Sequence, residues 1–158
     1  MDLRAHLLAA LDRAYDLKSW HGPNLKGSLR GVSPAVAFFR PGPERHSIYD
    51  LVLHAAYWKY VVRRRLSGEK RGSFALRALV EELPEHAFAA RFGRWTGEAV
   101  ISGAAAHDLY HAGQIQLLRK LAEGHPARTA RRSLAGCERG FARRSSDEAR
   151  TTLRETSA

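Results

Sequence analysis

Apolar residues recur every three or four positions over four stretches of the chain, which is the spacing of one face of an α-helix. The stretches cover residues 2–20, 47–67, 74–83 and 95–126. Alternation of apolar and polar residues, which is typical of a half-buried strand, is nearly absent. Short connections between amphipathic helices predict an all-α protein, built as an antiparallel four-helix bundle.

Capping residues mark the ends of these helices. Asp2 is placed to cap the first helix and Thr96 the fourth, while the letters SIYD at 47–50 match a capping box. Gly68 suits the left-handed turn that ends the second helix. The third helix is expected to be short, because it must end before Pro84.

Two regions interrupt the helical pattern. Residues 21–46 are rich in glycine and proline and are expected to form a linker. Within it, the apolar letters AVAFF at 35–39 predict either a helical turn or a short strand. After residue 121 the composition changes to Arg, Ser, Thr and Ala with few large apolar residues. The sequence therefore predicts a bundle domain over residues 1–121 and a basic, mobile, disordered tail over 122–158.

The composition limits the compartment and the partners. With 44% apolar residues, most of the chain is expected to fold. The single cysteine, Cys137, excludes an internal disulfide, so a reducing compartment such as the cytoplasm is expected. No run of about 18 apolar residues is present to cross a membrane. The net charge of +10 raises the question of nucleic-acid binding. However, no basic patch with interleaved aromatic residues occurs, so a solvated basic surface is the simpler interpretation.

The fourth helical stretch contains the letters HDLYHAGQIQLL, in which His107 and His111 stand four residues apart. Positions i and i+4 lie on one helix face a turn apart, so both imidazoles can reach one ion. Both also share a face with apolar core residues, where neutral imidazoles are costly to satisfy without a metal. The spacing by itself arises often by chance. Asp108 points about 100° away from His107 and is not expected to be a catalytic base.

A third histidine completes the predicted metal site. His54 lies beside the apolar face of the second helix, and ligands from facing helices converge on one ion in a bundle. Three histidines without a fourth protein ligand leave a position for water or substrate, as in catalytic zinc sites. Two polar residues are candidates to orient a ligand imidazole: Asp50, one turn before His54, and Gln114, three residues after His111. For Asp50, capping its own helix is the more ordinary role.

The segments around these histidines resemble a known family. The letters SIYDLVLHAAYWKYVVRRRLSGE, which contain His54, resemble one signature segment of the DinB-like superfamily. The letters AAAHDLYHAGQIQLLRKL, which contain His107 and His111, resemble the other, and residues 14–31 resemble the region after that family's first helix. The resemblance covers roughly residues 1–121. It implies a four-helix bundle with a three-histidine metal site, like that of thiol-dependent S-transferases and maleylpyruvate isomerases.

Two features depart from that family's pattern. The stretch between Gly72 and His107 is shorter than is usual in relatives, so the third helix is expected to be short and one flank of the bundle open. Dimer packing, domain swapping or the segment at 35–39 would cover such a flank, and a homodimer is therefore one expected assembly. The tail over 122–158 is the second departure.

The leading interpretation is a metal-dependent enzyme in which zinc or nickel activates a thiol or a water. The specific expectation is an S-transferase that uses a low-molecular-weight thiol and a small-molecule substrate, with hydrolysis and isomerisation as alternatives. A competing interpretation is a metal-binding stress protein without turnover, because no catalytic acid or base is evident. A nucleic-acid-associated protein is the third interpretation, and nucleic acid is not the expected partner.

Overall fold

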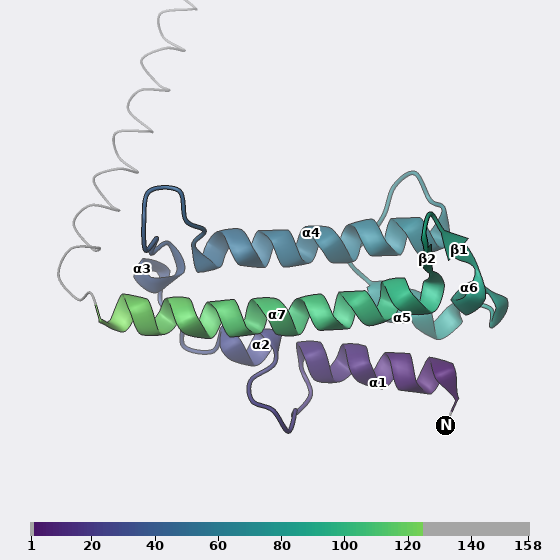
Figure 1. Ribbon diagram of the computed structural model, residues 1–158, viewed down its shortest axis with the longest axis horizontal. Coiled ribbons are helices and arrows are strands. Elements are labelled where there is room, and N and C mark those ends of the chain that lie inside the picture. Colours follow the sequence, from purple (N-terminus) through teal and green to yellow (C-terminus); the bar gives the residue numbers. More distant parts are fainter. Residues whose placement is uncertain (1, 125–158) are drawn as a thin grey trace, which may run out of the picture.

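The computed structural model describes residues 2–124, and most of these residues are helical. Two long helices, α4 (Ile48–Ser67) and α7 (Gly97–Glu123), run antiparallel along the length of the molecule (Figure 1). Helices α1 (Leu3–Tyr15) and α5 (Leu76–Glu82) pack beside them. The shorter elements are the helical turns α2 (Leu25–Ser28), α3 (Pro34–Ala37) and α6 (His86–Ala89) and the antiparallel strands β1 (Arg91–Phe92) and β2 (Trp95–Thr96).

The predicted helix ends are confirmed where a side chain caps the backbone. Asp2, Ser47 and Thr96 each accept a hydrogen bond from a backbone amide in the first turn of the helix that follows. Ser47 and Asp50 form the full capping box. Gly68 adopts a φ of 71° and ends α4 in the left-handed conformation. The starts of the long helices are therefore set by local hydrogen bonds that the sequence reveals.

The first helix ends earlier than predicted. α1 ends at Tyr15 instead of near residue 20, and Leu17, which lies beyond this end, is 57% exposed. The side-chain amide of Asn24 donates a hydrogen bond to the carbonyl of Leu17 at 2.7 Å. Because this carbonyl bonds to a side chain from the following segment, the chain leaves the helix and turns back toward α2.

The predicted linker contains two helical turns. Asn24 caps α2 and Ser33 caps α3 through their side-chain oxygens. Pro34, one of the prolines of the predicted linker, stands in the first turn of α3, where its missing N–H removes no helical hydrogen bond. Of the two alternatives for residues 35–39, the helical turn is therefore the one observed.

The connection before α7 also contains elements that the sequence did not predict. Helix α6 and the two-residue strands are too short to produce a recognisable period. Helix α6 packs on the first residue of α7, where a Cβ added to Gly97 would lie 2.2 Å from the carbonyl oxygen of Ala87. Glycine at this position is therefore what lets the two segments approach so closely.

The third predicted helix is present as α5, and it is short, as expected. The predicted tail over 122–158 lies mostly outside the described residues; α7 continues through Glu123, and Gly124 caps it. Within residues 2–124, none of the helices combines the length and the apolar character that a membrane span needs.

Buried apolar residues form two clusters along the α4–α7 pair. The larger cluster joins α1, α5 and α6 to the end of α4 and the start of α7. The smaller cluster joins α2 to the start of α4 and the end of α7. At the junction of the clusters lies a group that we call the polar layer: His54 and Lys59 of α4 with His107, Asp108 and His111 of α7. Polar groups in the middle of a core are costly unless they find partners, so this layer is where a function is expected.

Candidate metal centre

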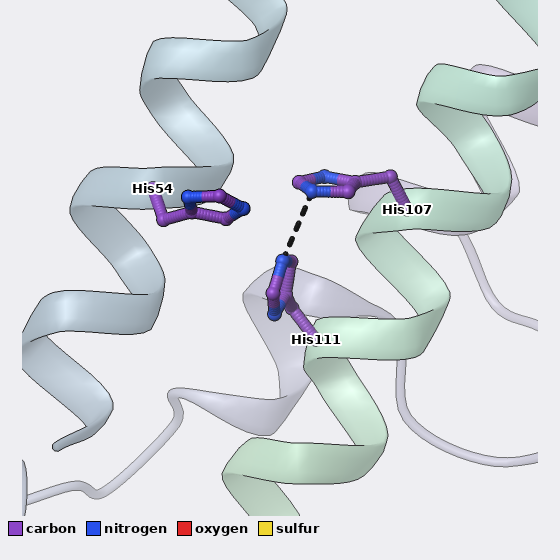
Figure 2. Close-up of side chains that lie close together, drawn as sticks. All are labelled: His54, His107 and His111. Carbon is purple, nitrogen blue, oxygen red and sulfur yellow. Dashed lines mark hydrogen bonds between the residues drawn. The ribbon is translucent and has the colours of Figure 1, made fainter. Parts of the chain in front are cut away.

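The three predicted histidines lie close together in the structure. His54 on α4 faces His107 and His111 on α7, as Figure 2 shows. One nitrogen from each ring lies within 4.8 Å of the other two, a grouping that can hold a metal ion. Two nitrogens bound to one tetrahedral zinc at about 2.1 Å lie about 3.4 Å apart. Side-chain shifts of roughly 1–1.5 Å therefore bring the three nitrogens to the distances of a zinc site.

The two histidines on α7 already contact each other. Their Nε2 atoms are 3.0 Å apart, in a hydrogen bond that only one of the two rings can donate (Figure 2). This contact follows from the spacing of four residues, which places His107 one turn before His111 on the same face. The helix therefore aims two nitrogens at one point, and α4 supplies the third.

The three side chains differ in exposure. His111 is 4% exposed and belongs to the core, His107 is intermediate, and His54 is exposed. Trp58, one turn after His54, lies beside the group, with its ring centroid 6.0 Å from that of His107. The cluster is therefore anchored in the core on one side and reaches solvent on the other, where a further ligand can approach.

Gln114 holds His111 in a defined orientation. Its Oε1 lies 2.6 Å from Nδ1 of His111, and its Nε2 donates to the hydroxyl of Tyr110 at 3.2 Å. Because Oε1 can only accept, Nδ1 of His111 carries the hydrogen and Nε2 presents a lone pair toward His107. Gln114, predicted to orient a ligand imidazole, thus makes the hydrogen bond that this role requires.

Asp50 serves its own helix. Its carboxylate accepts hydrogen bonds from the backbone N–H and the hydroxyl of Ser47 and pairs with Arg40 at 2.8 Å. Burial would raise the pKa of the Asp50 carboxyl, but these hydrogen bonds and the charge of Arg40 outweigh it and lower the pKa. The capping role is therefore observed, and a role in orienting His54 stays a prediction.

Burial favours the neutral form of both histidines on α7. It lowers the pKa of His107 to about 4, and the nearby His111, His54 and Lys59 act in the same direction. Burial also lowers the pKa of His111, although the hydrogen bond to Gln114 opposes this shift. A neutral imidazole is the form that binds metal ions, so both side chains are ready to bind at neutral pH.

The other side of the polar layer holds an ion pair that the sequence analysis missed. Nζ of Lys59 lies 2.7 Å from Oδ1 of Asp108, and the two side chains are 18% and 1% exposed. Burial raises the pKa of the Asp108 carboxyl, and the charge of Lys59 acts against this rise. Lys59 lies five residues after His54, about 140° around the helix. His107 and Asp108 are about 100° apart on α7, so each of the two helices has a histidine on one face and a charged residue on a neighbouring face.

Comparison with models of protein families, with curated proteins and with solved structures finds no match to this chain. The resemblance to the DinB-like superfamily therefore rests on the sequence segments around the three histidines. The structure itself establishes a mostly helical protein in which these histidines form a group that can hold a metal ion.

Proposed function

We propose that His54, His107 and His111 bind one divalent metal ion, zinc or nickel, in a helical bundle of the DinB-like type. The observation that carries the proposal is the convergence of three imidazole nitrogens within 4.8 Å from two antiparallel helices. Imidazole is a good ligand for both metals. The position of the group also supports it, because His111 is buried and His107 is half-buried, and imidazoles placed in this way need polar partners.

The bundle that we propose consists of α1, α4, α5 and α7 over residues 1–121. Helices α4 and α7 pack against each other, α1 packs on α7 and on α5, and α5 also contacts α4. In this arrangement α5 takes the place of the third helix of a four-helix bundle and covers only part of its length. The residues after 121 form a separate tail in this proposal.

The chemistry that we propose is thiol-dependent S-transfer to a small molecule. When bound, the ion would lower the pKa of a thiol or water in its open position. The three neutral imidazoles add no negative charge, so the full charge of the ion would act on the pKa of the bound thiol or water. Gln114 keeps the proton on Nδ1 of His111, so Nε2 has a lone pair that would bind the ion in place of its hydrogen bond with His107. The exposed ring of Trp58 offers an apolar surface beside the open side for a small substrate. A soft thiolate suits zinc and nickel better than a carboxylate does.

The second candidate function is metal binding without turnover. It is favoured by the hydrogen bonds around the group, which in residues 2–124 run between His107 and His111 and from His111 to Gln114. An amide cannot act as a general base. Asp108, the neighbouring carboxylate, already pairs with Lys59. A stress protein that sequesters an ion would need no more than this.

Metal analysis of the purified protein, followed by calorimetric titration with Zn²⁺ and Ni²⁺, tests the proposal. We expect one ion per chain, and a loss of affinity of at least roughly a hundredfold in His54→Ala, His107→Ala and His111→Ala. His6→Ala on α1, an exposed histidine outside the group, is the matched control and should bind as the wild type does. Equal binding by all four variants would refute the site.

Turnover separates the two candidate functions. The metal-loaded protein is mixed with cysteine or glutathione and 1-chloro-2,4-dinitrobenzene, in which the thiolate sulfur forms a bond to the ring carbon and chloride leaves. We expect the thioether to form faster than in the uncatalysed control, and the excess rate to vanish with chelator and in His111→Ala. Tight metal binding without turnover across a panel of thiols and electrophiles would favour the sequestering protein.

A further inference from the structure

A second candidate site lies on the other side of the polar layer. A cavity of about 420 Å³ is bounded by α1, α2, α4, α5 and Asp108 of α7. Its lining residues do not include His54, His107 or His111, so it is separate from the metal centre. Pockets that bind small molecules usually measure about 300–1,000 Å³, so this cavity is large enough for one.

The cavity lies beside the start of the short helix α5. Phe74 and Ala75, which precede α5, and Leu76 and Arg77, with which it begins, form one wall. The remaining walls are mostly apolar, and the apolar residues that line them include Leu11, Leu25, Leu29, Val52, Ala55 and Ala56.

Most of the charges around the cavity are already paired. Arg77 contacts Asp12 at 2.7 Å, and Lys26 contacts Asp16 at 2.8 Å. Lys59 contacts Asp108, and its ammonium also lies 4.8 Å from the ring centroid of Tyr15. A ligand in this cavity would therefore contact apolar walls and ion pairs whose charges already balance each other.

One lining residue, Asp108, has a buried side-chain oxygen that receives no hydrogen bond from residues 2–124. Oδ1 of Asp108 accepts the hydrogen bond from Lys59, whereas Oδ2 is buried and receives none from residues 2–124. A buried carboxylate oxygen that accepts no hydrogen bond is costly and is rare in folded proteins. A donor brought by a ligand would remove this cost.

We propose that this cavity binds a small, neutral, largely apolar molecule with one hydroxyl or N–H donor, which Oδ2 of Asp108 accepts. Neutrality follows from the ion pair, because Lys59 already balances the carboxylate. A cationic ligand would leave an uncompensated positive charge in the cavity, and an anion would face Asp108. Two exposed aromatic rings, Tyr15 and Phe74, line the cavity and favour a planar aromatic ligand.

Two probes of similar shape test the donor requirement. The full chain is titrated with 2-naphthol, which has a hydroxyl donor, and with 2-methoxynaphthalene, in which a methyl group replaces that hydrogen. We expect 2-naphthol to bind roughly tenfold more tightly, as is typical of a hydrogen bond to a charged acceptor. In Asp108→Asn, with an NH₂ group in place of Oδ2, this preference should disappear. Equal affinities of the wild type for both probes would overturn the proposal.

Variants that fill the cavity test whether the probes bind in it. Ala56→Phe places a ring in the cavity and should abolish binding of both probes. Ala78→Phe makes the same change at an exposed position on α5 outside the lining and should leave both affinities unchanged. If circular dichroism shows that Ala56→Phe does not fold, Ala75→Trp at the exposed edge of the cavity replaces it. Unaltered binding in a folded cavity-filled variant would place the probes elsewhere and overturn the proposal.

Discussion

The two sides of the polar layer differ in the charge state of their titratable groups. On one side, His107 and His111 are held neutral, and His54 joins them from α4 at the solvent-exposed edge. On the other side, Lys59 and Asp108 form a short ion pair within the protein. Both sides are built from the same two helices, about a third of a turn apart. Which partners a buried polar group finds therefore depends on the helix face to which it belongs.

This difference separates what should depend on the fold from what should depend on a metal ion. The charges of Lys59 and Asp108 balance each other within the protein, even though Oδ2 of Asp108 accepts no hydrogen bond from residues 2–124. The histidines form hydrogen bonds with one another and with Gln114, and among residues 2–124 no negative side chain belongs to their group. We therefore expect substitutions on the ion-pair side to change stability, and substitutions on the histidine side to change metal affinity.

The largest effect is expected from breaking the ion pair. Lys59→Met leaves the carboxylate of Asp108, which is 1% exposed, without its partner, and should lower the free energy of unfolding by about 3–5 kcal/mol. Urea denaturation of the chelated protein measures this loss. The double variant Lys59→Met/Asp108→Leu, which has no buried charge, should recover most of it. A cost below about 1 kcal/mol for the single variant would show that the pair does not matter to the fold.

Metal removal should have the next largest effect. At a free ion concentration a hundred times the dissociation constant, Zn²⁺ should raise the free energy of unfolding by about 2.7 kcal/mol, because it binds the folded group. Adding a chelator should reverse the gain. In His111→Ala the same titration should produce almost no shift, whereas Lys59→Met should retain the gain. A gain of equal size in His111→Ala would place the ion elsewhere.

Removal of the Gln114 hydrogen bond should weaken the histidine side alone. Gln114→Leu frees the ring of His111 to rotate and to change tautomer, and should lower metal affinity by about 10- to 100-fold. Calorimetric titration measures the change. Gln116→Leu, the same substitution two residues further along α7, is the control and should bind as the wild type does. If the two variants are indistinguishable, Gln114 does not orient the ligand.

The two roles considered for Asp50 can be distinguished in one variant. Asp50→Ala removes half of the capping box and the pair with Arg40, and should cost about 1 kcal/mol of stability. Since these contacts serve the helix, metal affinity should stay within about twofold of the wild type, against the 10- to 100-fold loss expected for an orienting residue. A loss of tenfold or more would show that Asp50 also orients His54.

The smallest expected effect is the dependence of the metal-free protein on pH. The pKa of His107 is about 4 in the folded protein and about 6.5 in an unfolded chain. Between these values the unfolded chain takes up a proton that the folded protein does not. The part of the free energy of unfolding that is linked to His107 is therefore fully present above about pH 6.5 and is lost as the pH falls toward 4. Because His107 is half-buried, solvent screening keeps the loss small.

Denaturation of chelated wild type and His107→Asn at several pH values measures this dependence. The variant lacks the titrating ring, so its stability should fall less between pH 6.5 and 4 than that of the wild type. Carboxylates elsewhere in the chain affect both proteins alike and cancel in the difference. Parallel curves for the two proteins would show that His107 is not held neutral by the fold.

Local chemistry determined much of this protein from sequence alone. The capping side chains of Asp2, Ser47 and Thr96 and the left-handed Gly68 act within one turn of the backbone, so their partners are near in sequence. The same is true of the pair formed by His107 and His111, because the helix repeat alone sets their relative position. Periodicity also located α4, α5 and α7, since their apolar faces are long enough to repeat.

The tertiary structure decided every contact that depends on which faces of two helices pack against each other. His54 lies 53 residues before His107, and only the packing of α4 on α7 brings the two within reach. Packing also sets Lys59 against Asp108, a pair that no short-range pattern encodes. The early end of α1 depends on Asn24, whose amide reaches back to a carbonyl in the turn before it. The helix repeat sets the directions of side chains around one helix axis. The contacts that form the candidate metal centre and the cavity join different helices, so the packing of the helices decides them.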